Sequence, residues 1–469
     1  MSKLNCDFSC LGENYIVPAS FELTKLNLNE IIVGATGCGK TFSFGYPRLL
    51  HTNYSSIVVP IAKKTLKVKF AKLFKARGYE VIDLDFTNPQ NNEYGYNPFD
   101  YVKTEEDMRM LADTIVYNGD KDKSRSDPYW DNAAISMLMA EIKYLFINAE
   151  IDGTKPKFSD LLNMQRGMCL MEYKELERSI KEGYADMVFA DRVRNLGHRR
   201  ISDSQIVAAL ERQNKETATN VDIKFIELEC ILPGNDASTA WKQINALPPR
   251  TLGCVISMAT SAIERFYTEN IVRLCEKKKH ISFESIGRRK TAFFITTSPV
   301  NKALQSYINL MYSQLFKVLF EDAQNSPDEK LNIPVHIICD DFACGGTIKD
   351  FDDYISIFRA VGISVSLYLQ SETQLATMYG EKEATTIINN CDTYVFMGSM
   401  DIETCKRIAE RLDKPLTTVL DMPAGKVAIF RRGSKPVITN RYPTLEDPLY
   451  KKLIANRIAE DENTEKEAM

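Results

Sequence analysis

Residues 34–41 read Gly-Ala-Thr-Gly-Cys-Gly-Lys-Thr, directly after the apolar run Ile31-Ile32-Val33. This stretch fits G-x-x-x-x-G-K-[ST], a pattern typical of the phosphate-binding loop of nucleoside triphosphatases. Its glycines let the backbone wrap around phosphate oxygens so that N–H groups point inward. A helix that begins near Gly39 would add the positive end of its dipole. The sequence therefore predicts a nucleotide site between a strand and a helix.

Each position of this loop has an expected role. Lys40 would bring a point charge to the β- and γ-phosphates, and the Thr41 hydroxyl would serve Mg²⁺. A plain glycine turn is the alternative interpretation, and the flanking apolar segments disfavour it. The predicted phosphate-cradling residues are Gly34, Ala35, Thr36, Gly37, Cys38, Gly39, Lys40 and Thr41.

Length and composition bound the class of protein. The 469 residues suffice for two or three domains, and the net charge of −4 means that a nucleic acid would have to meet local basic patches. Eleven cysteines without a C-x-x-C pair, with only four histidines, disfavour a zinc site and suit a reducing cytoplasm. No signal peptide or long apolar span is apparent, so membrane contact is expected only through a partner.

Strand and helix signals alternate along much of the chain. Helical patterns separate the apolar runs, which favours an α/β fold with a mostly parallel sheet. Residues 105–255 instead carry long helical patterns, including 204–231, and predict an all-α insertion domain. The sheet domain then comprises residues 1–104 and 256–469. The expected strands are 31–33, 57–59, 81–84, 292–296, 335–339, 363–369 and 393–397, followed by a hairpin of 427–430 and 436–439.

Two basic clusters, at residues 63–77 and 192–200, have two interpretations. A solvated helix face is the simpler one, and a DNA-facing surface is the other.

Polar residues follow two of the expected strands. Asp340 and Asp341 come directly after 335–339, and acids at the carboxyl end of a buried strand are where a doubly wound sheet places its chemistry. Asp340 would hold the Mg²⁺ shell, and Asp341 would act as base or orient the attacking water. Gln370 ends the strand 363–369 and would sense the γ-phosphate or orient water, with a plain polar cap as the simpler interpretation. Arg359 precedes that strand and would reach a neighbouring subunit's nucleotide as an arginine finger, with an ordinary surface arginine as the simpler interpretation.

In combination, these motifs resemble those of the type IV secretion coupling proteins, the TraG/TraD-like ATPases of conjugation within the HerA–FtsK superfamily. The resemblance covers residues 28–445. It rests on GATGCGKT at 34–41, GYEVIDLDFTNP and YNPFDY within 78–101, DPYWDNAA at 127–134, IICDDFACGG at 337–346, FRAVGISVSLYLQSETQLATMYG at 358–380 and NNCDTYVFMGSMD at 389–401.

The resemblance implies a RecA-like P-loop domain interrupted by an all-α domain, assembled as a hexameric ring with ATP and Mg²⁺ between subunits. It implies a motor that brings relaxase-bound DNA, expected to be single-stranded, to the type IV secretion channel. By motif position, Lys40 and Thr41 carry over as phosphate and Mg²⁺ ligands, and Asp340 as the metal-shell acid. Arg359 carries over as the trans arginine and Gln370 as the sensor.

Three departures from the family pattern bear on function. Asp341 stands where the family has glutamate, and residues 60–64 read PIAKK where the family favours Asp-Pro-Lys-Gly. Many members begin with transmembrane helices, whereas this chain starts almost at the sheet domain. The expectation is therefore a cytoplasmic protein, at most peripheral at the inner face of the membrane, with any anchor encoded separately.

The leading functional hypothesis is a conjugative DNA-translocating ATPase. One alternative is a weakly hydrolysing, nucleotide-binding docking module for relaxase or protein cargo, which Asp341 motivates. Another is a HerA/FtsK-type DNA pump outside conjugation.

Overall fold

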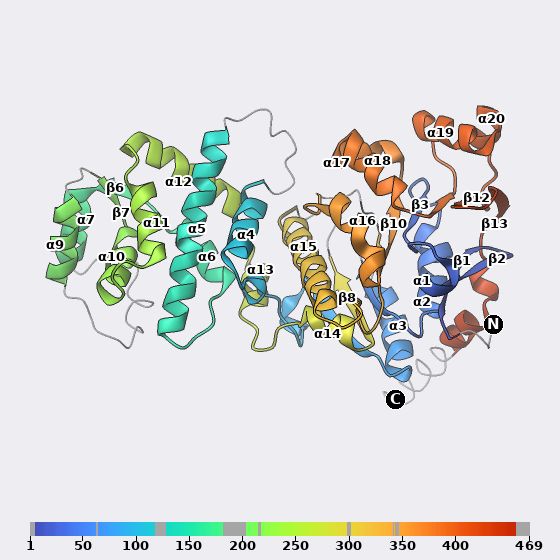
Figure 1. Ribbon diagram of the computed structural model, residues 1–469, viewed down its shortest axis with the longest axis horizontal. Coiled ribbons are helices and arrows are strands. Elements are labelled where there is room, and N and C mark those ends of the chain that lie inside the picture. The colour runs from blue at the N-terminus through green and yellow to red at the C-terminus, as the bar shows by residue number, and fades with distance from the viewer. Residues whose placement is uncertain are drawn as a thin grey trace, which may run out of the picture. The chain divides into compact units, whose positions relative to one another are not determined.

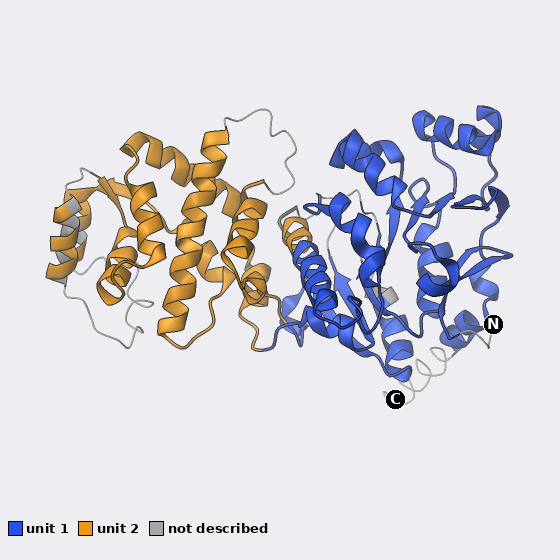
Figure 2. Cartoon of the chain, viewed as in Figure 1, with its two compact units in different colours: residues 1–94, 279–301, 311–469 blue, residues 95–278, 302–310 orange. Residues whose placement is uncertain are grey.

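The computed structural model describes residues 5–61, 64–117, 128–181, 203–213, 217–297, 302–340, 342 and 347–455 (Figure 1). The chain forms two compact units (Figure 2). Unit 1 comprises Met1–Tyr94, Lys279–Asn301 and Met311–Met469, and unit 2 comprises Gly95–Lys278 and Lys302–Leu310. The helical unit thus extends beyond the expected limits of 105 and 255 at both ends.

Unit 1 is built on a nine-stranded sheet with the order β13-β12-β11-β3-β10-β9-β4-β8-β5. The strands from β11 to β5 are parallel, while β12 and β13 join one edge antiparallel. This confirms the predicted α/β class with a mostly parallel sheet. The strands are β3 Glu30–Val33, β4 Ser56–Ile61, β5 Glu80–Asp85, β8 Thr291–Thr296, β9 Val335–Cys339, β10 Ile363–Leu369, β11 Thr393–Phe396, β12 Lys426–Arg431 and β13 Val437–Asn440.

Helices cover this sheet, and for that reason its central strands are buried along their whole length. Every residue of β8, β9 and β10 is buried. Helix α3 packs on β4, β5 and β8, and α16 packs on β10. The helices of unit 1 are α1 Phe21–Thr24, α2 Tyr46–Leu50, α3 Lys64–Ala76, α14 Phe283–Arg288, α16 Phe351–Val361, α17 Glu372–Tyr379, α18 Glu381–Asn389, α19 Ile402–Leu412 and α20 Leu416–Leu420; α15, Lys302–Gln324, gives its first residues to unit 2.

The last residue of the basic cluster at 63–77, Arg77, has a structural role. The Arg77 guanidinium donates to the carbonyls of Leu50 (2.8 Å) and Thr52 (2.6 Å), at the carboxyl end of α2. These carbonyls lack helical partners, so a cation there satisfies them. Arg77 therefore caps α2, while Phe70 and Phe74 of α3 point into the core. Of the other cluster, at 192–200, nothing lies within the described residues.

An N-terminal hairpin, β1 (Asp7–Gly12) and β2 (Tyr15–Ala19), was not expected from the sequence. Its turn meets the edge strand β13, since the Glu13 N–H donates to the Asn440 carbonyl at 2.9 Å. Gly12 is needed there because a Cβ would come within 2.5 Å of the Thr439 side chain.

In the part of unit 2 that the structure describes, the chain is helical except for one small antiparallel sheet, β6 (Leu170–Glu172) with β7 (Thr217–Thr219). The prediction of one long helix over 204–231 is wrong. The Thr219 hydroxyl accepts from the Asp222 N–H at 3.2 Å, and the Asp222 carboxylate accepts from the Thr219 N–H at 2.8 Å. This reciprocal pair is a capping box, and a new helix begins there. The helices are α4 Glu105–Tyr117, α5 Pro128–Ile151, α6 Phe158–Arg166, α7 Tyr173–Lys181, α9 Asp203–Gln213, α10 Asp222–Ile231, α11 Asp236–Asn245, α12 Pro249–Glu264 and α13 Glu269–Cys275. Across the ranges described, no helix is long and apolar enough to cross a membrane.

Glu141 of α5 is a carboxyl group in the core of unit 2. It is 0% exposed, and burial raises its pKa well above the usual range. The Gln165 side-chain amide is oriented so that its nitrogen donates to Glu141 and its oxygen accepts from Thr260. The Gln165 nitrogen then lies 2.6 and 3.0 Å from the two carboxyl oxygens of Glu141. A raised folded-state pKa means that the folded protein binds this proton more tightly than the unfolded chain does. The free energy of unfolding therefore falls as pH rises from about 4.3 toward the folded-state pKa.

Replacing Glu141 with glutamine is expected to raise the free energy of unfolding of unit 2 at pH 7 by about 1 kcal/mol or more, because an amide has no charge to bury. The gain should shrink at pH 4.5. Urea unfolding followed by tryptophan fluorescence measures this, since both tryptophans, Trp130 and Trp241, lie in unit 2. The exposed Glu150→Gln is the control. A Glu141→Gln protein less stable than wild type at pH 7 would contradict the prediction.

Candidate functional site

The loop at residues 34–41 leaves β3 between β10 and β11, at the carboxyl ends of the parallel strands. The Gly34 N–H donates to the Leu369 carbonyl (3.0 Å), and the Ala35 N–H donates to the Gly398 carbonyl (3.1 Å). Gly37 and Gly39 have φ of +77° and +89°, a region that side chains rarely adopt. The tight loop is thus held by both neighbouring strands and depends on its glycines.

Polar groups converge on this loop. The Lys40 ammonium, buried at 7% exposure, donates to the carbonyls of Gly34 (2.7 Å) and Ala35 (3.4 Å). The Thr41 hydroxyl donates to a carboxylate oxygen of Asp340 at 2.7 Å. The structure therefore brings Asp340, from the end of β9, against the loop although the two lie far apart in sequence.

This oxygen pair suits a magnesium ion. Mg²⁺ in nucleotide sites takes one or two protein oxygens and completes its shell with phosphates and water. A threonine hydroxyl beside a carboxylate supplies those oxygens, so Thr41 and Asp340 are the residues that would hold the ion.

The helix after the loop begins as a π-helix, Thr41–Gly45, and continues as α2. The Tyr46 N–H accordingly bonds the Thr41 carbonyl, one residue further back than in an α-helix. Pro47 explains the widening, because its ring lacks an N–H and would clash with the carbonyl four residues earlier. The sequence predicted a helix here but not its wide first turn.

The other predicted site residues are placed differently. Half-buried Gln370 directly follows β10, beside the loop, because its neighbour Leu369 bonds Gly34. Arg359 is exposed in the last turn of α16, near the amino end of β10. The seven residues of β10 put about 20 Å between that end and the loop. Asp341 lies outside the described residues.

A segment that sequence analysis did not single out also contacts the loop. Residues 441–450, here called the C-terminal arm, follow β13. The Arg441 guanidinium donates to the Cys38 carbonyl at 2.6 Å, and the Thr444 hydroxyl donates to the Phe42 carbonyl at 3.0 Å. No periodicity or motif marks this arm, so only its long-range contacts reveal it.

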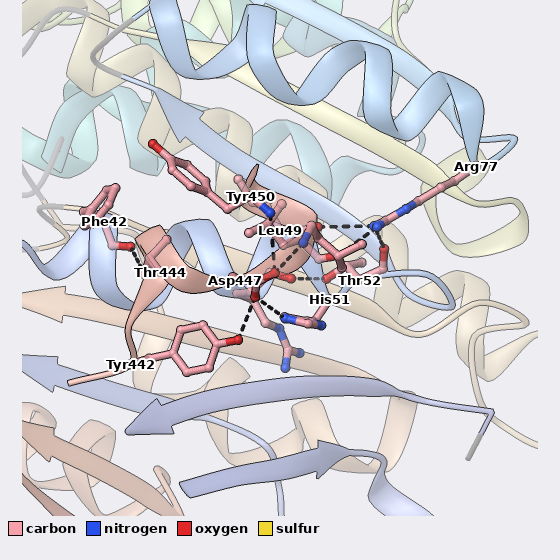
Figure 3. A network of polar contacts seen from close by, with 12 residues as sticks. Phe42, Leu49, His51, Thr52, Arg77, Tyr442, Thr444, Asp447 and Tyr450 are labelled. Atoms are coloured by element: carbon pink, nitrogen blue, oxygen red, sulfur yellow. Dashed lines mark hydrogen bonds and ion pairs between the residues drawn. The ribbon is translucent and has the colours of Figure 1, made fainter. Parts of the chain in front are cut away.

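Asp447 anchors the arm to the end of α2 (Figure 3). Its carboxylate lies 2.8 Å from His51 Nε2 and accepts from the Tyr442 hydroxyl at 2.6 Å. Burial alone would raise the pKa of Asp447, but the hydrogen bonds from Tyr442 and His51 outweigh burial, and its pKa is lowered. The aromatic ring of Tyr450 packs on Phe42 and Tyr46.

A glycine-rich loop at the carboxyl end of a parallel strand, with an acid from another strand on its threonine, defines the P-loop nucleoside triphosphatase fold. The family model for Type IV secretory system Conjugative DNA transfer matches residues 20–421, and the chain belongs to that family. The resemblance inferred from the motifs is thereby confirmed.

Solved structures share the fold. The bacterial conjugative coupling protein TrwBdeltaN70, in complex with sulphate, is 16% identical, with a TM-score of 0.55 over 88% of this chain and 85% of that chain. The plasmid coupling protein TrwB with ADP and Mg²⁺ is 15% identical, with a TM-score of 0.52 over 90% and 88%. VirB4 of Thermoanaerobacter pseudethanolicus is 9% identical, with a TM-score of 0.52 over 96% and 99%. A search of the curated proteins gave no significant match.

Proposed function

We propose that this chain is a conjugative coupling protein that binds ATP with Mg²⁺ and hydrolyses it to move relaxase-bound DNA to a type IV secretion channel. The observation that carries the proposal is the hydrogen bond from Thr41 of the phosphate loop to Asp340 at the end of β9. Family membership supports the transport role. The similar TrwB was solved with ADP and Mg²⁺ and with non-hydrolysable GTP and ATP analogues, which supports the choice of ligand.

Nucleotide binding would rearrange the loop's own contacts. Lys40 would exchange the Gly34 and Ala35 carbonyls for β- and γ-phosphate oxygens, where its charge is worth more. Asp340 would keep the Thr41 hydroxyl oriented and hold the metal shell. When bound, Mg²⁺ neutralises charge on the phosphates during transfer. Asp341 is proposed to orient water, and Gln370 to sense the γ-phosphate.

The position of Arg359 supports a ring with shared sites. Its side chain is exposed and lies about the length of β10 away from its own loop. A guanidinium there reaches phosphate only if the nucleotide belongs to a neighbouring copy. We therefore propose a homo-hexamer with nucleotide between subunits and DNA in the channel.

One hydrolysis experiment tests the motor. Phosphate release is expected to rise severalfold when single-stranded DNA is added to the wild-type protein. Arg359→Ala and Lys40→Ala, each expected to be inactive alone, should recover hydrolysis when they are mixed, because a site with Lys40 from one chain and Arg359 from its neighbour is then complete. Exposed Lys435→Ala, which removes a charge elsewhere in unit 1, is the control.

The outcomes separate the candidate functions. No recovery of hydrolysis in the mixture of Arg359→Ala with Lys40→Ala would contradict the trans role of Arg359. Slow hydrolysis at a rate that DNA does not change would favour the docking module. That alternative is motivated by Asp341, whose side chain is one methylene shorter than the glutamate of the family.

A further inference from the structure

We propose that Arg441 is a positioning residue of the phosphate loop, which orients the Cys38–Gly39 peptide toward bound phosphate. The inference rests on the proposed function, because it concerns the same nucleotide site. It adds to that site a residue outside the motif that defines the loop, contributed by the C-terminal arm.

The geometry of the peptide group carries the first step. Arg441 Nη1 lies 2.6 Å from the Cys38 carbonyl oxygen. In a trans peptide the carbonyl and the following N–H point in opposite directions, and the described part of the chain contains no cis peptide bond. The Gly39 N–H is therefore directed away from Arg441. In a phosphate loop that N–H belongs to the set that cradles the phosphates.

Two features restrict position 39 to glycine, its backbone angle and the nearby guanidinium. Its φ of +89° lies in the left-handed region, which favours glycine. A Cβ added there would also meet Arg441 Nη1 at 3.2 Å. The loop glycine and the arginine thus fit against each other closely.

The backbone around Arg441 is held from two directions. The Arg441 N–H donates to the Gly425 carbonyl at 2.8 Å, at the start of β12. The preceding Asn440 bonds Glu13 through both its carbonyl (2.9 Å) and its side-chain amide (2.7 Å). The arginine is therefore presented to the loop by the edge hairpin and by the β1–β2 turn.

The guanidinium also brings charge to the loop. Its Nη1 bonds the neutral Cys38 carbonyl, and its Nε is buried without a hydrogen-bond partner. A guanidinium bonded in this way keeps its positive charge beside the loop, which favours a bound anion. Further along the arm, the Thr444 bond to Phe42 and the Asp447 bond to His51 keep the arm against the helix that follows the loop.

Nucleotide affinity tests the assignment directly. Titration of a fluorescent ADP analogue with Mg²⁺ is expected to give a Kd about tenfold weaker for Arg441→Ala, the loss of one charge-assisted hydrogen bond. Arg441→Met should weaken nucleotide binding by the same factor. Methionine keeps most of the aliphatic part of the arginine side chain, so a loss of packing would not explain this weaker binding. Arg441→Lys, with charge but without the planar fork, should fall between. Lys435→Ala is the matched control and should bind as wild type does.

Hydrogen exchange gives a second readout that needs no ligand. In Arg441→Met without nucleotide, the peptide covering residues 34–41 should exchange faster, while peptides of β9 and β10 stay unchanged.

The inference fails if Arg441→Met keeps wild-type affinity and wild-type exchange of the loop while Lys40→Ala loses binding. That result would leave the nucleotide site intact and Arg441 without a role in it. If Lys40→Ala also bound nucleotide normally, the proposed nucleotide site itself would fall, and this inference with it.

Discussion

Replacing Lys40 with alanine is expected to weaken ATP binding by about a hundredfold and to abolish hydrolysis. The buried ammonium lies within the phosphate loop, bonded to the Gly34 and Ala35 carbonyls, and it would move only a short way to meet phosphate. Hydrogen bonds from a charged donor are worth about 1.5–3 kcal/mol each, so losing more than one accounts for this factor. Titration with a fluorescent nucleotide gives the affinity, and phosphate release gives the rate.

Two controls make the Lys40 result specific. Lys435→Ala removes an exposed charge from the same unit and should change neither quantity. An unchanged thermal unfolding midpoint of Lys40→Ala would show that the loop is altered without loss of the fold. Steady hydrolysis by Lys40→Ala at the wild-type rate would remove the proposed site.

Replacing Asp340 with asparagine is expected to lower Mg²⁺-dependent hydrolysis by about two orders of magnitude or more, with a smaller effect on metal-free binding. The amide oxygen can still accept from the Thr41 hydroxyl, which lies 2.7 Å from the native carboxylate, so the loop keeps its support. What is lost is the negative charge that holds the metal shell. Without Mg²⁺, nucleotide should bind equally well or better, because one repulsive charge is gone.

The measurement is hydrolysis across a range of Mg²⁺ concentrations, with nucleotide affinity determined separately in a chelator. Asp328→Asn, an exposed acid of unit 1, is the control and should behave as wild type does. Asp340→Asn with a normal rate at low Mg²⁺ would show that this carboxylate does not serve the metal.

Much of the fold was predictable because its signals are local. Each expected strand of unit 1 coincides with an observed one to within a few residues, since buried strands are mostly apolar segments that lie between turn residues. The loop at 34–41 and the acid at 340 were predicted in the same way. Both follow such segments, and parallel strands end at one edge of the sheet.

The errors arose where local signals conflict or are short. Residues 204–231 are helical in composition, yet the strand β7 interrupts them. The Thr219–Asp222 capping box then starts a second helix. The π-helix at Thr41–Gly45 depends on one proline two residues beyond it. In the N-terminal hairpin, the polar residues Asp7 and Ser9 interrupt β1 and Pro18 interrupts β2, so neither strand carries a clear apolar pattern.

The sequence by itself determined the class of fold and the family, and it predicted the chemistry of the phosphate loop, because these depend on residues that are neighbours in the chain. Only the tertiary structure decided that Asp340 reaches Thr41, that Arg359 lies far from its own loop, and that the C-terminal arm supports Cys38. Arg441 and Cys38 are 403 positions apart, and no periodicity connects them. Their contact exists because the order of strands and the edge hairpin carry the arm back to the loop.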